Sequence, residues 1–306
     1  MKLNFNGKIK KHLYENLAPT ECNNPETLFF KKARELIPNR KIMSVKTARR
    51  LVSNLSDAQK NNLKVLLDIL RSQNFIDESS KLKTKISPHK FFGIFQKVID
   101  KLIQHKKVQL KKTQKIILLG SSLDKIGFLL ELRGYDVTYV PFSRSSSIYK
   151  KYSYTEDDFY LESLIQISQI DGFSNKELHQ IGVNKIKKEE NKEYIIIDMS
   201  HSARSLFFFS RALQQYLNQP ITMVSIPNMD ESFLMTFKDD IKIPQTIKFV
   251  ELPISNKKFY QLSKEYRCIP LVQGKSTVKM TKQQILLCNL IRLGIVISFQ
   301  EDSSFF

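Results

Sequence analysis

Two short apolar runs set the pattern of this chain, because each is followed by small polar residues and then by apolar residues at helical spacing. The runs cover residues 115–119 and 194–197. Unbroken runs of this length, rich in β-branched side chains, are typical of strands that are buried on both faces of a parallel sheet. We therefore predict two strand–loop–helix units and an α/β domain built around them.

The same pattern predicts the remaining elements of that domain. Gly134 stands where the helix after the first strand would end in a left-handed conformation. The last helix would begin with a capping box, Thr281 and Gln284. The further predicted elements are a strand over 135–142, helices over 155–170 and 206–217, strands over 221–226 and 248–254, and a last helix over 285–297.

Before residue 113 the apolar positions recur at intervals of three and four residues, which predicts helices. Residues 1–22 show no firm period and are expected to be irregular. The clearest helix starts at Pro88. The lysines at its C-terminal end would interact favourably with the negative end of the helix dipole. The predicted helices cover 24–37, 44–54 and 56–75, and a fourth starts at 88 and carries Lys106, Lys107, Lys111 and Lys112 at its C-terminal end.

The net charge of +19 is distributed unevenly along the chain. Residues 1–112 contain 25 lysine and arginine residues against 9 aspartate and glutamate residues, whereas the remainder is nearly balanced. We therefore predict a basic helical domain over 1–112 and an α/β domain over 113–306 that includes the C-terminal helix. The charge favours an anionic partner for the first domain, either nucleic acid or an anionic membrane surface. Alternatively, the lysines only keep the helices soluble. The densest local patch is formed by Lys41, Lys46, Arg49 and Arg50.

Composition also bears on location. No run approaches the roughly 18 apolar residues of a membrane span, so no transmembrane segment is expected. The first 17 residues lack the apolar middle of a secretory signal. Cys22, Cys268 and Cys288 lie far apart in the sequence, which is typical of reduced thiols in the cytoplasm. The aromatic C-terminal tail also resembles the export signals of effector proteins from intracellular bacteria, which would place the protein in a host cell.

The candidate chemistry lies in the loops after the two core strands. Open parallel sheets bind ligands at the carboxyl ends of their strands, and both loops are expected there. Residues 120–124 form the first loop, and residues 198–205 form the second. Ser202, Ala203 and Ser205 open a helix, whose N-terminal N–H groups can hold an anion.

Residues 195–206 resemble the phosphoribosyl-pyrophosphate loop of the type I phosphoribosyltransferase family. That loop is an apolar strand, two acids, a variable pair and then Thr-Thr-Gly-x-Thr. Asp198 matches the second acid, and Ile197 stands in place of the first. The other matches are His201 and Ser202 to the threonine pair, Ala203 to the glycine and Ser205 to the last threonine. Arg204 adds a cation that suits a phosphate.

The earlier loop resembles the pyrophosphate-binding loop of the same family, and Arg144 resembles its basic pyrophosphate contact. The resemblance implies a Rossmann-like core, a phosphorylated sugar or nucleotide as ligand, Mg²⁺ as cofactor, and a mobile segment over 146–190. It also implies glycosyl transfer in which Asp198 holds a ribose hydroxyl, carried out here by a divergent or degenerate transferase. The implied ligand-binding residues are Gly120, Ser121, Ser122, Asp124, Arg144, Ser202, Ala203, Arg204 and Ser205.

A second enzymatic hypothesis uses some of the same residues. Residues 120–123 are similar to the Gly-Asp-Ser-Leu block of the SGNH hydrolases, with Ser121 in place of the aspartate, and 198–201 has the spacing of their Asp-x-x-His. Ser122 would then be the nucleophile, His201 the base and Asp198 the residue that orients it. Against this hypothesis, the Asp-x-x-His segment lies at the tip of a buried strand, and about a third of the chain follows it.

Overall fold

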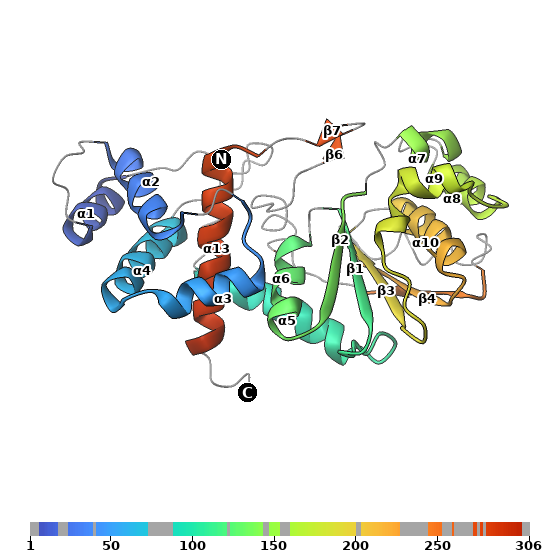
Figure 1. Cartoon of the computed structure of the whole chain (residues 1–306), viewed down its shortest axis with the longest axis horizontal. Coiled ribbons are helices and arrows are strands. Elements are labelled where there is room, and N and C mark those ends of the chain that lie inside the picture. Colours follow the sequence, from blue (N-terminus) through green and yellow to red (C-terminus); the bar gives the residue numbers. More distant parts are fainter. Residues whose placement is uncertain are drawn as a thin grey trace. The chain divides into compact units, whose positions relative to one another are not determined.

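The computed structural model defines the elements of the chain (Figure 1). It describes residues 6–17, 24–38, 41–72, 88–120, 123–142, 147–153, 160–199, 203–226, 244–252, 259, 272–273, 276–277 and 280–301. By their internal contacts the residues form two compact units. The first unit is Met1–Gln96, Lys264–Cys268 and Met280–Phe306, and the second is Lys97–Ser263 and Ile269–Lys279.

The described part of the first unit is helical, as the apolar spacing predicts. One expectation was wrong: residues 7–16 form a helix within the segment that the sequence pattern left irregular. Asn6 caps that helix by accepting a hydrogen bond from the N–H of Ile9 at 3.1 Å. Only one apolar residue per turn faces inward, so the periodic signal was weak. The helices are α1 (Gly7–Asn16), α2 (Pro25–Leu36), α3 (Val45–Asn54), α4 (Asp57–Ser72), the first part of α5 (Pro88–Gln104) and α13 (Lys282–Glu301).

The C-terminal helix α13 is a core element of this first unit, where it packs against α2, α3 and α4. Its buried polar side chains bind the backbone before α3. The Asn289 side chain accepts from the Met43 N–H and donates to the Lys41 carbonyl oxygen, each at 2.9 Å, and Arg292 donates to the Met43 carbonyl. The approach to α4 is close at Gly294, where a Cβ atom would lie 2.9 Å from a Leu67 methyl group.

The predicted domain boundary therefore needs correction. The sequence placed it after residue 112 and counted the last helix with the α/β domain, whereas the division falls within α5 and α13 belongs to the helical unit. The sequence position of α13, after the α/β segment, did not indicate its unit, because a helix that is apolar on most sides can be buried in either one. By length and composition, residues Lys282–Gln300 could also cross a membrane, but 61% of that window is buried among the other helices, and buried core helices pass the same test.

The second unit contains a five-stranded, all-parallel sheet, which confirms the α/β prediction. The strand order is β2-β1-β3-β4-β5. Parallel strands that are buried on both faces need a covering layer on each side, and helices supply it. The strands are β1 (Lys115–Leu119), β2 (Asp136–Val140), β3 (Tyr194–Asp198), β4 (Ile221–Ser225) and β5 (Ile247–Glu251), and a separate antiparallel pair is formed by β6 (Val272–Gln273) and β7 (Ser276–Thr277).

Helix α6 (Asp124–Leu132) lies on one face of this sheet (Figure 1). It contacts the sheet closely at Gly127, where a Cβ atom would lie 2.5 Å from both a Leu118 methyl group and the Tyr139 hydroxyl. The helix ends as predicted at Gly134, which has φ of 85°. The Tyr135 N–H then bonds to the Leu130 carbonyl at 3.0 Å, which completes a Schellman motif.

The opposite face is covered by α10 (Arg204–Leu217) together with the helices α7 (Ser147–Tyr152), α8 (Tyr160–Ser168) and α9 (Asn175–Ile181). Residues of these helices share one hydrophobic cluster with Ile117 and Ile196 of the sheet. The Gln215 side chain binds both backbone groups of Phe173 at 2.7 Å, which ties α10 to the start of α9. The described part of 146–190 thus includes three packed helices, and the mobility that the family resemblance implies for this segment stays a prediction.

Replacing Asn289 by alanine is expected to lower the free energy of unfolding by about 1–3 kcal/mol. The change leaves the buried Met43 N–H and the Lys41 carbonyl without this partner, and unsatisfied buried groups carry a cost of that size. The midpoint of urea unfolding, followed by circular dichroism, measures the effect. Gln283→Ala on the exposed side of the same helix is the control and should change stability by less than about 0.5 kcal/mol. Equal effects of the two changes would contradict the assignment of α13 to a packed core.

Gly127→Ala is expected to destabilise the second unit by about 1–3 kcal/mol, because the added methyl group meets Leu118 and Tyr139 in a filled interior. The matched control is Gly93→Ala in α5, where nothing lies within 4 Å of the added Cβ. That change should raise stability by up to about 1 kcal/mol through helix propensity alone. Chemical denaturation of both variants gives the comparison, and a stabilising Gly127→Ala would show that α6 does not pack this closely.

Candidate functional site

The two loops singled out in the sequence follow neighbouring strands of the sheet. β1 pairs directly with β3 in parallel, with Lys115 opposite Tyr194 and Leu118 opposite Ile197. Both strands therefore end at the same edge. The chain leaves β1 towards α6 on one face and leaves β3 towards α10 on the other. This reversal of direction between adjacent strands is the position at which open α/β sheets bind ligands.

In the first loop, the described residues have structural roles. Gly120 has φ of 71°, a conformation that favours glycine, and its N–H bonds to the Val140 carbonyl at 2.9 Å. The Asp124 side chain is fully buried and forms an ion pair with Lys125 at 3.3 Å. Asp124 thus neutralises a buried lysine at the start of α6, and its carboxylate does not face the loop surface.

In the second loop, Asp198 and Ser205 lie together. The Ser205 hydroxyl donates to a carboxylate oxygen of Asp198 at 3.2 Å, across seven positions of sequence. The Asp198 carbonyl accepts from the Ile226 N–H at 2.8 Å, which fixes the strand end. Asp198 is 9% exposed, so its carboxylate lies at the edge of the buried core.

Ala203 and Arg204 begin α10 in different ways. Ala203 is the N-cap and has φ of 50°, the left-handed region that non-glycine residues rarely adopt. Arg204 is 1% exposed, and its guanidinium donates to the Ser163 hydroxyl of α8 at 3.4 Å. The side chain of Arg204 therefore connects α10 to α8, and its burial does not favour the expected phosphate contact.

Several predicted site residues lie outside the described residues. They are Ser121, Ser122, Arg144, His201 and Ser202. The hydrolase hypothesis rests on Ser122 and His201 and stays a prediction. Of its three residues the structure describes Asp198 alone, whose carboxylate is bonded to Ser205.

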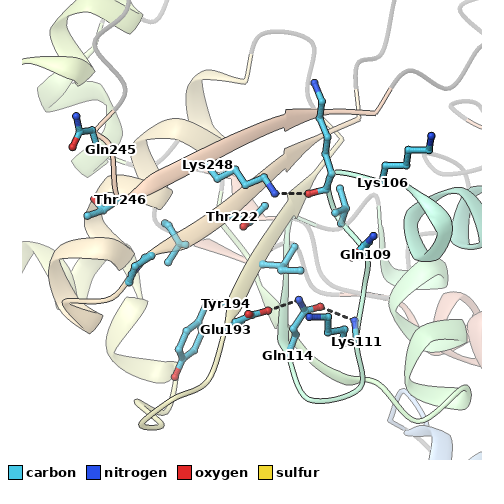
Figure 2. A pocket seen from close by; sticks show the side chains of 15 residues that line it. Lys106, Gln109, Lys111, Gln114, Glu193, Tyr194, Thr222, Gln245, Thr246 and Lys248 are labelled. Carbon is cyan, nitrogen blue, oxygen red and sulfur yellow. Dashed lines mark hydrogen bonds between the residues drawn. The ribbon is translucent and has the colours of Figure 1, made fainter.

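A pocket of about 370 Å³ lies at the opposite, amino edge of the sheet (Figure 2). It is bounded by the segment that leads into β1 and by the first residues of β3, β4 and β5. Sequence reasoning assigned the lysines at 106–112 to the end of α5 and so missed this pocket. The lining residues are Lys106, Lys107, Val108, Gln109, Lys111, Gln114, Glu193, Tyr194, Ile195, Pro220, Ile221, Thr222, Gln245, Thr246 and Lys248.

The described residues do not test whether the predicted basic patch binds an anionic partner, or whether the protein binds the predicted metal ion. Lys41, Lys46, Arg49 and Arg50 are all exposed on or just before α3, so an anionic partner of the helical unit stays a prediction. Within the described ranges no group of three or more histidine, cysteine, aspartate or glutamate side chains could hold a metal ion. One carboxylate, that of Asp198, stands at the second loop.

Comparisons with known proteins do not place the chain in a family. No protein-family model matches it, and neither the curated proteins nor the solved structures give a match. The functional argument therefore depends on the geometry of the chain itself.

The helices α7 and α9, which follow β2, are held together by a polar contact. Glu177 of α9 accepts hydrogen bonds from Lys151 at 2.5 Å and from the Tyr152 hydroxyl at 2.6 Å, both of α7. It also closes the capping box with Ser174. These hydrogen bonds, led by the one from Lys151, lower the pKa of Glu177 from 4.5 to about 2.

The contact predicts a pH dependence of stability with a definite sign. Because the folded-state pKa of Glu177 is depressed, its contribution is complete above the unfolded value of 4.5 and is lost as the pH falls towards about 2. The difference in unfolding free energy between wild type and Glu177→Gln should therefore narrow over that interval. Urea unfolding at a series of pH values measures it. Glu190→Gln, which removes an exposed carboxyl group, is the control, and an equal narrowing in both variants would contradict the assignment.

Proposed function

We propose that the chain binds a phosphorylated sugar or nucleotide at the carboxyl edge of the sheet, in the manner of a type I phosphoribosyltransferase. The observation that carries the proposal is the direct pairing of β1 with β3. Because of this pairing, the ends of the two strands, Leu119 and Asp198, are neighbours at the edge where such folds bind ligands. A ligand there can contact both loops at once.

The conformation of Ala203 supports the resemblance in the second loop. The family has glycine at the matching position, and Ala203 adopts φ of 50°, which glycine adopts at no steric cost. A left-handed alanine costs about 1–2 kcal/mol, and such conformations cluster where a loop must approach a ligand. An alanine also supplies no side-chain oxygen to cap the first turn of α10, whose N-terminus favours an anion.

The role of each described residue follows from its contacts. The Asp198 carboxylate accepts a hydrogen bond from a ribose hydroxyl. Ser205 orients this carboxylate through its own hydrogen bond to Asp198 at 3.2 Å. The first N–H groups of α10 face the phosphate. Arg204 and Asp124 contribute to packing and charge pairing in the interior, so we remove both from the set of direct ligand contacts.

A magnesium ion that arrives with the phosphates of the ligand would be compatible with Asp198, the carboxylate described in the second loop. Mg²⁺ in proteins commonly keeps several waters and takes one or two carboxylates plus substrate phosphates, a need that Asp198 meets. The ion would offset phosphate charge. Ile197, in place of the first acid of the family, is fully buried. A single carboxylate therefore holds the ribose, where the family has two acids. Because correct positioning supplies much of this catalysis, we expect the protein to bind its ligand but to transfer the glycosyl group slowly.

Thermal-shift titration with phosphoribosyl pyrophosphate and Mg²⁺ tests the proposal. A ligand that binds the folded state must raise the unfolding midpoint. Asp198→Asn should weaken binding about tenfold or more, because hydrogen bonds to a charged group are worth about 1.5–3 kcal/mol. Asp171→Asn, the same substitution at an exposed loop residue, should leave the titration unchanged. No shift with phosphoribosyl pyrophosphate, ribose 5-phosphate or nucleotides, with or without Mg²⁺, would refute the proposal.

A further inference from the structure

The pocket at the amino edge of the sheet is positively charged. Lys106, Lys107, Lys111 and Lys248 line it, against Glu193 as the one acidic residue among the lining side chains. Three of the lysines come from the segment before β1, and the fourth comes from β5, far along the chain. Four cations beside one anion form an unbalanced charge in a concave site, which raises the local concentration of anions.

The carboxylate of Glu193 is already engaged. It accepts a hydrogen bond from the Gln114 side-chain amide at 2.6 Å, and the oxygen of that same amide accepts from the backbone N–H of Lys111, also at 2.6 Å (Figure 2). Gln114 is 4% exposed, so the amide at the centre of this bridge is buried. Glu193 therefore has a structural partner in Gln114, and the lysine side chains outnumber the acids that could neutralise them within the pocket.

The backbone that carries the lysines is anchored. Val108 and Leu110 are buried, whereas the neighbouring lysines stay exposed. The N–H groups of Val108 and Gln109 both bond to the His105 carbonyl at 2.9 Å, and Gln109 has φ of 44°. On the other side, Lys248 donates to the Lys107 carbonyl at 2.7 Å, which ties β5 to the segment. The lysines are thus presented by a fixed turn.

The dipole of α5 does not account for these lysines. The helix ends at Gln104, so Lys106, Lys107 and Lys111 follow its last turn, and the dipole effect falls off within that turn. Their backbone is held in place by the buried residues Val108 and Leu110, and Lys248 adds a further lysine from β5. This arrangement indicates a site at which positive charge is concentrated.

We propose that this pocket binds a compact polyphosphate anion, of the size of a nucleoside triphosphate or smaller. Small-molecule sites commonly have about 300–1,000 Å³, a range that includes this pocket and that is too small for a nucleic-acid duplex. Lysine ammonium groups bind phosphate as point charges, and several of them match a ligand that carries several charges close together. Gln109, Thr222 and Thr246 add hydrogen-bonding groups to the lining.

This site is separate from the one proposed at the carboxyl edge. The strands of a parallel sheet run in one direction, so the residues that begin them and the loops that end them lie at opposite edges. The two proposals therefore predict sensitivity to different substitutions and can fail independently.

Isothermal titration calorimetry of the full chain with ATP and with inorganic tripolyphosphate tests the inference. Wild type is expected to bind with saturation, and Lys106→Gln/Lys111→Gln to lose affinity by about tenfold or more, with a weaker dependence on salt. The variant should stay folded by circular dichroism, because Gln114 holds the backbone N–H of Lys111 and not its side chain.

Two variants serve as controls. Lys150→Gln/Lys176→Gln removes the same charge from exposed positions on α7 and α9 and should bind as wild type does. Asp171→Asn, which changes an exposed loop residue outside both proposed sites, should also leave this binding unchanged. Three results would overturn the inference: no saturable binding of either probe, an equal loss in both lysine variants, or lysine-dependent binding of a single-stranded oligonucleotide alone.

Discussion

The fold of the second unit depends on the in-register pairing of β1 with β3. Ile116–Leu118 and Ile195–Ile197 are buried, so their backbone polar groups must bond across the strands or remain unsatisfied away from water. A slip of one residue would exchange the side chains that face α6 with those that face α10, and each would then have to repack against a different layer of helices. The register is therefore fixed by core packing, and core packing fixes where both strands end. The relation between the two loops follows from it.

The same pairing gives the sheet two edges with different chemistry. At the carboxyl edge, among the described residues, Asp124 and Lys125 neutralise each other and Arg204 points into the interior, which leaves Asp198 with Ser205 as the polar pair of the loops. At the amino edge the acid is engaged and the lysines stay at the surface. Positive charge near the carboxyl loops is thus used for packing. At the amino edge Lys115 and Lys192 pair with Asp136, whereas the lysines that line the pocket are exposed.

The strands were predictable from the sequence because each is an unbroken apolar run between turn residues. The predicted limits of β1 are those of the structure, and Gly134 ends α6 as expected. The helix α1 was missed because its buried residues, Ile9 and Leu13, are separated by Lys10, Lys11 and His12. The place of α13 could not be predicted either, since the polar groups that fix it, Asn289 and Arg292, bind backbone near residue 43, about 250 positions earlier. Periodicity identifies a buried face but not its partner.

The candidate site shows the same limit for charged residues. From the sequence, Arg204 beside a small-residue loop predicts an anion contact, and lysines after a helix predict a dipole interaction. The structure adds what the sequence could not show, because the direction of a side chain depends on its neighbours in space. Ser163, from another helix, receives Arg204, and Lys248, from the far strand, joins Lys107. A charge becomes part of a binding site only when its partners leave it at the surface. The Gln114 bridge meets that condition at the amino edge, because it engages Glu193 through an uncharged amide and uses none of the lysine side chains.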